Sequence, residues 1–158
     1  MALAGLIVVN PRQKGATGEN KVKEFLDSKT PYTFERTPGS GSGSIKGDLH
    51  IPGYRNVFCI EVKNYAESHL NDKILTSKTN EFVGWWTKLQ RQAGIMKPLL
   101  IFKYNRSKLF VATDIKPTNV EKRIDIPHLN CYTCLLDEWI EREPITWLIL
   151  PTKDFQKI

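Results

Sequence analysis

The sequence GDLHIPGYRNVFCIEVK, residues 47–63, contains two short apolar runs separated by a turn-forming segment. Residues 47–51 and 57–64 predict two strands, because the proline, glycines and asparagine between them favour a turn. We therefore expect this stretch to form an antiparallel hairpin.

The length of the turn determines which residues face each other. With a loop of residues 53–56, Pro52 pairs with Val57, and Asp48 lies directly opposite Glu61. Successive strand residues point to opposite faces. The apolar face collects Leu49, Ile51, Phe58, Ile60 and Val62. The other face collects Asp48, His50, Cys59, Glu61 and Lys63.

Asp48 and Glu61 together predict a site for a divalent cation. Two carboxylates about 5 Å apart across neighbouring strands repel each other, and a bound cation removes that repulsion. Lys63 points to the same side and would steer a hydroxide or offset charge developing on a substrate. The alternative is a solvated polar face on an edge hairpin, where acidic and basic residues simply alternate.

Composition indicates one globular domain over residues 1–158, because 41% of the residues are hydrophobic and 25% are charged. A net charge of +6 favours an anionic partner such as nucleic acid. The odd number of cysteines, 3, fits a reducing compartment. Residues 1–10 lack a basic region and a convincing cleavage site, and no later segment is long enough to span a membrane. We expect an intracellular, cytoplasmic protein with no membrane partner.

A first helix is expected from an N-cap at Thr17 to about Ser28. Its buried stripe, at i, i+3 and i+4 spacing, comprises Val22, Phe25 and Leu26. Glu19 would lie in the first turn, where the helix dipole stabilises an anion. Its position also allows it to lean over the neighbouring sheet toward the two carboxylates.

After an expected strand at residues 32–37, residues 38–46 form a loop rich in glycine and serine. Such a segment is a flexible linker or, between Arg36 and Lys46 and just before Asp48, a cradle for phosphate. Its serine hydroxyls include Ser40 and Ser42.

A second long helix is expected from Thr79 or Asn80 through Ala93, closed by a glycine. Its apolar face comprises Phe82, Trp86, Leu89 and Ala93. Lys88 and Arg91 form a basic edge. The tryptophans at 85 and 86 are core or dimer-interface residues, or alternatively platforms for stacked bases; Gln90 is either solvated or directed at the site.

The remaining segments are less regular. Residues 98–104 and 108–113 predict a strand hairpin, residues 115–130 are irregular, and residues 135–141 form a short helix. Cys131-Tyr-Thr-Cys134, preceded by His128, is either an ordinary strand-to-helix junction or part of a zinc site.

With a glutamate helix, Gly47-Asp48 and Glu61-Val62-Lys63 followed by a helix and a strand, the chain resembles the PD-(D/E)XK nuclease superfamily. More narrowly, Lys14-Gly15 before Glu19, and the segment from Arg36 to Ser44, are similar to archaeal-type Holliday junction resolvases and their phage-encoded relatives. The resemblance covers about residues 12–104. Its one departure near the ligands is Gly47, where the superfamily name has proline.

The resemblance implies an α/β fold with a restriction-endonuclease-like core, in which α-helices flank a mixed central β-sheet. It also implies a Mg²⁺-dependent phosphodiesterase, with Mn²⁺ as a substitute and no organic cofactor. Asp48, Glu61 and the Val62 carbonyl would be the direct ligands, and Glu19 would hold the metal or its water. Lys63 would orient the attacking water.

Relatives of this kind act as homodimers on four-way DNA junctions, and a phage-encoded protein would act in the host cell. The residues here that would contact phosphates are Lys14, Arg36, Ser40, Ser42, Lys46, Lys88 and Arg91. Two alternatives stay open: another PD-(D/E)XK endonuclease, restriction-like or for repair, and a DNA-binding module without catalysis.

Overall fold

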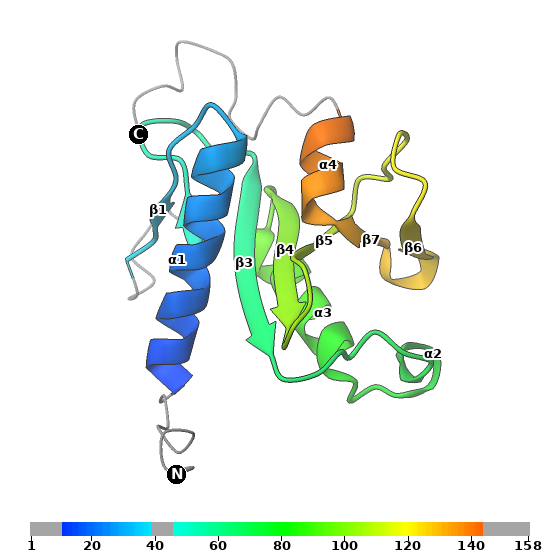
Figure 1. The fold of residues 1–158 in the computed structure, drawn as a ribbon. Coiled ribbons are helices and arrows are strands. Elements are labelled where there is room, and N and C mark those ends of the chain that lie inside the picture. The colour runs from blue at the N-terminus through cyan, green and yellow to red at the C-terminus, as the bar shows by residue number, and fades with distance from the viewer. Residues whose placement is uncertain (1–10, 39–45, 144–158) are drawn as a thin grey trace.

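The computed structural model of the chain describes residues 11–38 and 46–143, with the side chains of residues 11–15 left out. Its seven-stranded sheet has the order β1-β2-β3-β4-β5-β7-β6 (Figure 1). The strands are β1 (Glu35–Arg36), β2 (Leu49–His50), β3 (Phe58–Tyr65), β4 (Lys97–Tyr104), β5 (Phe110–Thr113), β6 (Arg123–Ile126) and β7 (Cys131–Leu135). The helices are α1 (Pro11–Lys29), α2 (Lys73–Thr76), α3 (Glu81–Ala93) and α4 (Leu136–Arg142), with a 3₁₀ turn, η2 (Pro127–Leu129).

The central strands β3 and β4 are parallel, and every other neighbouring pair is antiparallel. A parallel pair needs a crossover connection, and α3 provides it here. The sheet is therefore mixed, and the predicted α/β class with a mixed sheet flanked by helices is confirmed.

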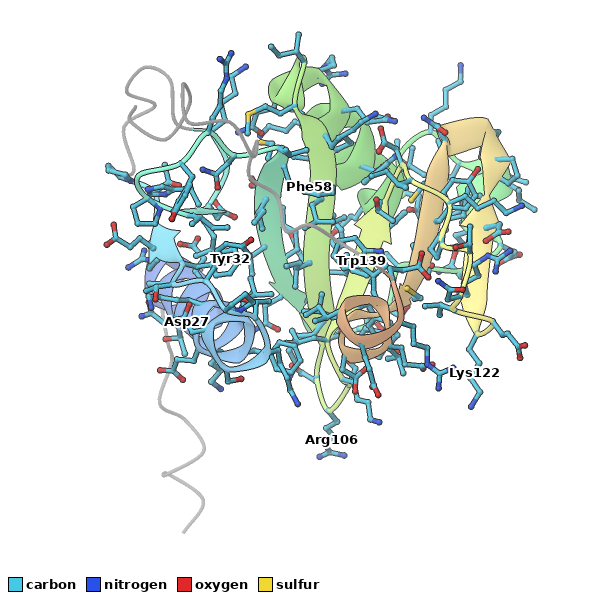
Figure 2. The ribbon with its side chains drawn as sticks, turned by 90° about the horizontal axis from the view of Figure 1, so that it is seen from above. Asp27, Tyr32, Phe58, Arg106, Lys122 and Trp139 are labelled. Atoms are coloured by element: carbon cyan, nitrogen blue, oxygen red, sulfur yellow. The ribbon has the colours of Figure 1, made fainter. Side chains whose placement is uncertain are left out.

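Two apolar cores cover the two faces of the sheet. Seen from above, α3 lies on one side, while α1 and α4 lie on the other (Figure 2). The core under α1 and α4 includes Val22, Leu26, Leu49, Ile60, Ile101 and Trp139. The core under α3 includes Cys59, Phe82, Trp86, Leu89, Leu100 and Phe102. The predicted apolar stripes of both long helices are therefore buried where expected.

The hairpin forms with the predicted register. Leu49 pairs with Ile60, so Asp48 lies opposite Glu61. The side chain of Asn56 holds the turn, because its oxygen accepts from the Ile51 N–H at 2.7 Å and its amide donates to the Ile51 carbonyl at 2.9 Å. The strand at residues 47–51 is shorter than predicted and comprises only Leu49–His50.

Three further predictions about the helices and strands are wrong. Helix α1 begins at Pro11, not after Thr17; proline is favoured at a helix start, and Glu19 therefore lies in the helix interior, away from the first turn. The expected strand at 32–37 shortens to Glu35–Arg36. Residues within 115–130 form β6, because they pair with β7 at the edge of the sheet.

The CxxC segment is a strand-to-helix junction, since β7 leads directly into α4. Cys131 lies in the core under α3, whereas Cys134 lies in the core under α1 and α4. Two thiols on opposite faces of a strand cannot share one ion, so the zinc interpretation is wrong. No helix in the described part of the chain is long and apolar enough to cross a membrane.

Candidate active site

The centre of the site is the pair Asp48 and Glu61 at the junction of β2 and β3. The Asp48 N–H donates to the Ile60 carbonyl at 2.6 Å. The Val62 N–H donates to Asp48 Oδ2 at 2.8 Å. The Asp48 carboxylate therefore continues the hydrogen bonding of β3 where the short strand β2 does not, and its position is fixed by backbone atoms.

Gly47 makes this approach possible. Its φ is +86°, and a Cβ added there would lie 2.6 Å from the Ile60 carbonyl oxygen and 2.8 Å from the Ile60 nitrogen. Side chains are therefore excluded both by space and by the left-handed backbone. Proline, whose ring holds φ near −65°, cannot occupy this position. The presence of Gly47, where the superfamily name has proline, thus has a physical cause in this chain.

Both carboxyl groups have raised pKa values. The pKa of Asp48 is raised from 3.8 to about 6. Burial is the main cause; the hydrogen bond from Val62 acts to lower the pKa, and the nearby charge of Glu19 acts to raise it. Burial and then the charge of Asp48 raise the pKa of Glu61 from 4.5 to about 7, while Lys63 and Lys88 act to lower it. Two half-buried acids that repel each other would be stabilised by a shared cation.

Three lysines lie near the site, and the charges of two of them, Lys63 and Lys88, act on the pair. Lys63 Nζ lies 4.0 Å from Glu61 Oε1. The charge of Lys88, from α3, acts on Glu61, and that of Lys46 acts on Cys59, two residues before Glu61. Lys46 Nζ also lies close to Gly94, because a Cβ added to that glycine would be 3.3 Å from Lys46 Nζ. Lys63 and Lys88 therefore place positive charge beside the carboxylates.

Glu19 reaches the site from α1, although it is paired. Arg36 Nε donates to Glu19 Oε1 at 3.0 Å, and Arg36 is the more exposed partner. The charges of both residues act on Asp48. Glu19 therefore lies close enough to influence the carboxylates, as its predicted lean over the sheet required.

The donor chemistry fits a hard divalent cation, which prefers oxygen ligands and retains several waters. Within residues 11–38 and 46–143, no three His, Cys, Asp or Glu side chains form a metal-binding group. The set that fits is two carboxylates, Asp48 and Glu61, and one backbone oxygen. Because the N–H and C=O of a strand residue point to the same neighbouring strand, and the Val62 N–H points at Asp48, the Val62 carbonyl faces the same side.

The predicted DNA contacts fall into two groups. Arg36, Lys46, Lys88 and Arg91 are exposed, and the first three act electrostatically on site residues. Ser40 and Ser42 lie outside the described residues, as does the side chain of Lys14.

Gln90 does not reach the carboxylates, because its amide donates to the Leu129 carbonyl at 3.2 Å. Trp86 Nε1 donates to the same carbonyl at 2.8 Å, and Trp86 is fully buried. Trp86 is therefore a core residue. Trp85 instead stacks on Tyr65, with ring centroids 4.2 Å apart. The sequence interpretation did not include Tyr65, although strand alternation from Lys63 places it on the same face.

A mixed sheet that carries facing carboxylates and a Glu-Val-Lys strand defines a nuclease-like α/β core. Residues 10–154 match the family described as phage putative PDDEXK endonuclease, and the chain belongs to this family. The match extends beyond residue 104, where the resemblance in sequence was expected to end.

A relative with a curated description is Protein D14 of Escherichia phage T5, which is 31% identical over 132 residues. The alignment covers 78% of this chain and 82% of that protein. Among solved structures, the Holliday junction resolvase Hjc of Archaeoglobus fulgidus aligns with a TM-score of 0.40 and 17% identity, over 77% of this chain and 88% of that one.

Proposed function

We propose that this chain is a phage-encoded, Mg²⁺-dependent DNA endonuclease that resolves four-way junctions as a homodimer in the host cell. The observation that carries the nuclease assignment is the placement of Asp48 opposite Glu61, with the Asp48 carboxylate held by the Val62 N–H. Family membership supports the same class of activity. The choice of a junction as substrate rests on the sequence resemblance to resolvases.

In this proposal Asp48, Glu61 and the Val62 carbonyl hold the metal, with Glu19 beside them. When bound, Mg²⁺ lowers the pKa of a water and polarises the scissile phosphate. Lys63 orients the attacking water and stabilises the charge that develops on the phosphate. Lys88 and Arg36 bind flanking phosphates, so binding weakens steeply as salt increases.

The metal assignment is tested with Asp48→Asn and Glu61→Gln, which preserve size while removing charge. Both should abolish Mg²⁺-dependent cleavage of DNA, measured on gels, and should leave binding of a four-way junction largely intact. Asp114→Asn is a matched control, because Asp114 is also a half-buried acid with a raised pKa but its neighbouring cation is Lys97. Unchanged cleavage by Asp48→Asn or Glu61→Gln would refute the assignment.

The substrate is tested by comparing cleavage of a four-way junction with that of a linear duplex of the same sequence. A resolvase should cut the junction much faster and place paired, symmetric nicks on two strands. Equal rates, or unpaired nicks, would exclude junction resolution and leave another endonuclease of this family. Sedimentation of the protein alone and with a junction tests the homodimer.

A further inference from the structure

Three aromatic side chains meet at the carboxyl end of β3, and we call Tyr65, His69 and Trp85 the aromatic cluster. Tyr65 and Trp85 stack with an interplanar angle of 27°. His69 lies edge-on to both, with ring centroids 5.8 Å from Tyr65 and 5.5 Å from Trp85. All three residues are half-buried, so each is partly exposed to solvent.

The aromatic cluster is held in place by the start of α3. Glu81 Oε2 lies 3.4 Å from His69 Nε2. Asn80 donates from its side chain to the His69 carbonyl at 3.0 Å, while its side-chain oxygen caps α3 by accepting from the Val83 N–H. The rings are therefore ordered before any ligand arrives, which lowers the entropic cost of binding.

The aromatic cluster adjoins the proposed catalytic residues. Tyr65 lies two residues beyond Lys63 on β3, which places it on the same face of the sheet and about 7 Å further along the strand. Figure 1 shows the segment that follows β3 leaving its carboxyl end toward α2 and then α3. A small, shallow hollow lies at this end of the sheet. Its lining includes Tyr65, His69, Trp85, Phe102, Lys103 and Tyr104.

We propose that the aromatic cluster binds an unpaired nucleobase of the DNA substrate, next to the phosphate that is cleaved. This inference rests on the proposed nuclease function. Aromatic side chains stack on any base, because every base has a π-face. In a continuous duplex each base is already stacked, and extracting one costs a few kcal/mol. The aromatic cluster therefore favours DNA that offers an unpaired base near the cut, such as a duplex with a single-stranded arm, over a fully paired linear duplex.

A fluorescent base provides the direct test. The DNA is a duplex with one single-stranded arm, carrying 2-aminopurine either at the first unpaired nucleotide or inside the paired region. Metal-free protein is added, so that binding is measured without cleavage. Stacking on the aromatic cluster should quench the unpaired 2-aminopurine, whereas the paired probe should be unaffected. Equal responses at the two positions in the wild-type complex would overturn the proposal.

Variants identify the residues responsible. Tyr65→Leu and Trp85→Leu should each abolish the quenching. Each should also weaken binding of the duplex with a single-stranded arm about tenfold, the effect of one lost stacking contact, while the affinity for linear duplex is unchanged. Trp85→Phe should retain most of both signals. Tyr54→Leu is the matched control, since Tyr54 is an exposed tyrosine in the β2–β3 turn, before β3 begins.

The proposal would be refuted if Tyr65→Leu and Trp85→Leu bind the duplex with a single-stranded arm as tightly as Tyr54→Leu does. Circular dichroism confirms that the variants are folded. If Trp85→Leu fails to fold, the proposal is still tested by Tyr65→Leu and by comparing the two probe positions in complexes with the wild-type protein. Failure of the nuclease assignment is separable: a wild-type protein that quenches the unpaired probe normally but, with Mg²⁺, cleaves neither this DNA nor a four-way junction would refute that assignment while supporting the aromatic cluster.

Discussion

The two edges of β3 differ in how completely they are paired. Toward β4 the ladder is continuous, from Phe58 opposite Lys97 to Tyr65 opposite Tyr104. Toward β2, among the residues that the structure describes, the only paired position is Leu49 opposite Ile60. Beyond that pair, the Asp48 side chain takes over the Val62 N–H.

This difference shows how one strand can serve both stability and chemistry. The continuous edge satisfies the backbone and carries the fully buried residues of β4, such as Leu99 and Ile101. The interrupted edge leaves backbone and carboxylate oxygens directed past the end of β2, where the described residues form no further strand. Its acids are destabilised by burial and mutual repulsion, which is the condition that favours binding of a cation.

The largest effect on stability is expected from the continuous edge. Ile101 is completely buried, and Ile101→Ala should lower the free energy of unfolding by about 2–5 kcal/mol, measured by urea denaturation. Ile95→Ala is the control, because Ile95 is 94% exposed and its change should stay within about 0.5 kcal/mol. Similar costs for the two variants would mean that β4 does not form the core described.

The interrupted edge depends instead on a glycine. Gly47→Ala should cost about 1–3 kcal/mol from the positive φ alone, and displacement of the Ile60 backbone adds to this. Gly53→Ala is matched, because its φ is +83° but no atom lies within 4 Å of the added Cβ. We expect Gly47→Ala to be the more destabilising and to reduce cleavage strongly, while Gly53→Ala leaves cleavage intact. Equal effects on stability and cleavage would contradict the role given to this close approach.

These contrasts show what the sequence could and could not predict. Alternation and turn length are local, so they predicted that Asp48 faces Glu61, and the 3.6-residue period predicted the buried stripe of α3. The ion pair between Glu19 and Arg36 and the approach of Lys88 join elements distant in the chain, and no local pattern specifies such contacts. The predicted start of α1 was wrong because Thr17 is an acceptable N-cap residue, but the longer helix does not use it as one.

Proton binding gives a smaller effect with a defined sign. A carboxyl whose folded pKa is raised contributes stability below its unfolded pKa and loses it as pH rises through the folded value. For Asp48 and Glu61 this window runs from 3.8 to about 7. At about pH 8 without metal, Asp48→Asn and Glu61→Gln should therefore melt about 2–4 °C above the wild type, equivalent to ~1 kcal/mol.

At about pH 4 the same variants should lose this advantage, because the wild-type carboxyls are then protonated. Adding Mg²⁺ at about pH 8 should raise the melting temperature of the wild type but not that of the variants. Differential scanning fluorimetry measures both effects. A pH-independent difference, or an equal response to Mg²⁺, would show that these two acids are not the coupled, cation-binding pair.

The smallest effect is expected where Glu19 meets Arg36. The Arg36 side chain is 45% exposed, so Glu19→Gln and Arg36→Gln should each change stability by less than about 1 kcal/mol. Their effects on the metal should nevertheless oppose each other, because Glu19 adds negative charge near Asp48 and Arg36 offsets it. Glu19→Gln should raise the Mg²⁺ concentration needed for half-maximal thermal stabilisation several-fold, and Arg36→Gln should lower it. If neither midpoint changes, the only role of Glu19 is to connect α1 to β1 through its ion pair with Arg36. The interrupted edge of β3 then binds its cation without help from the helix.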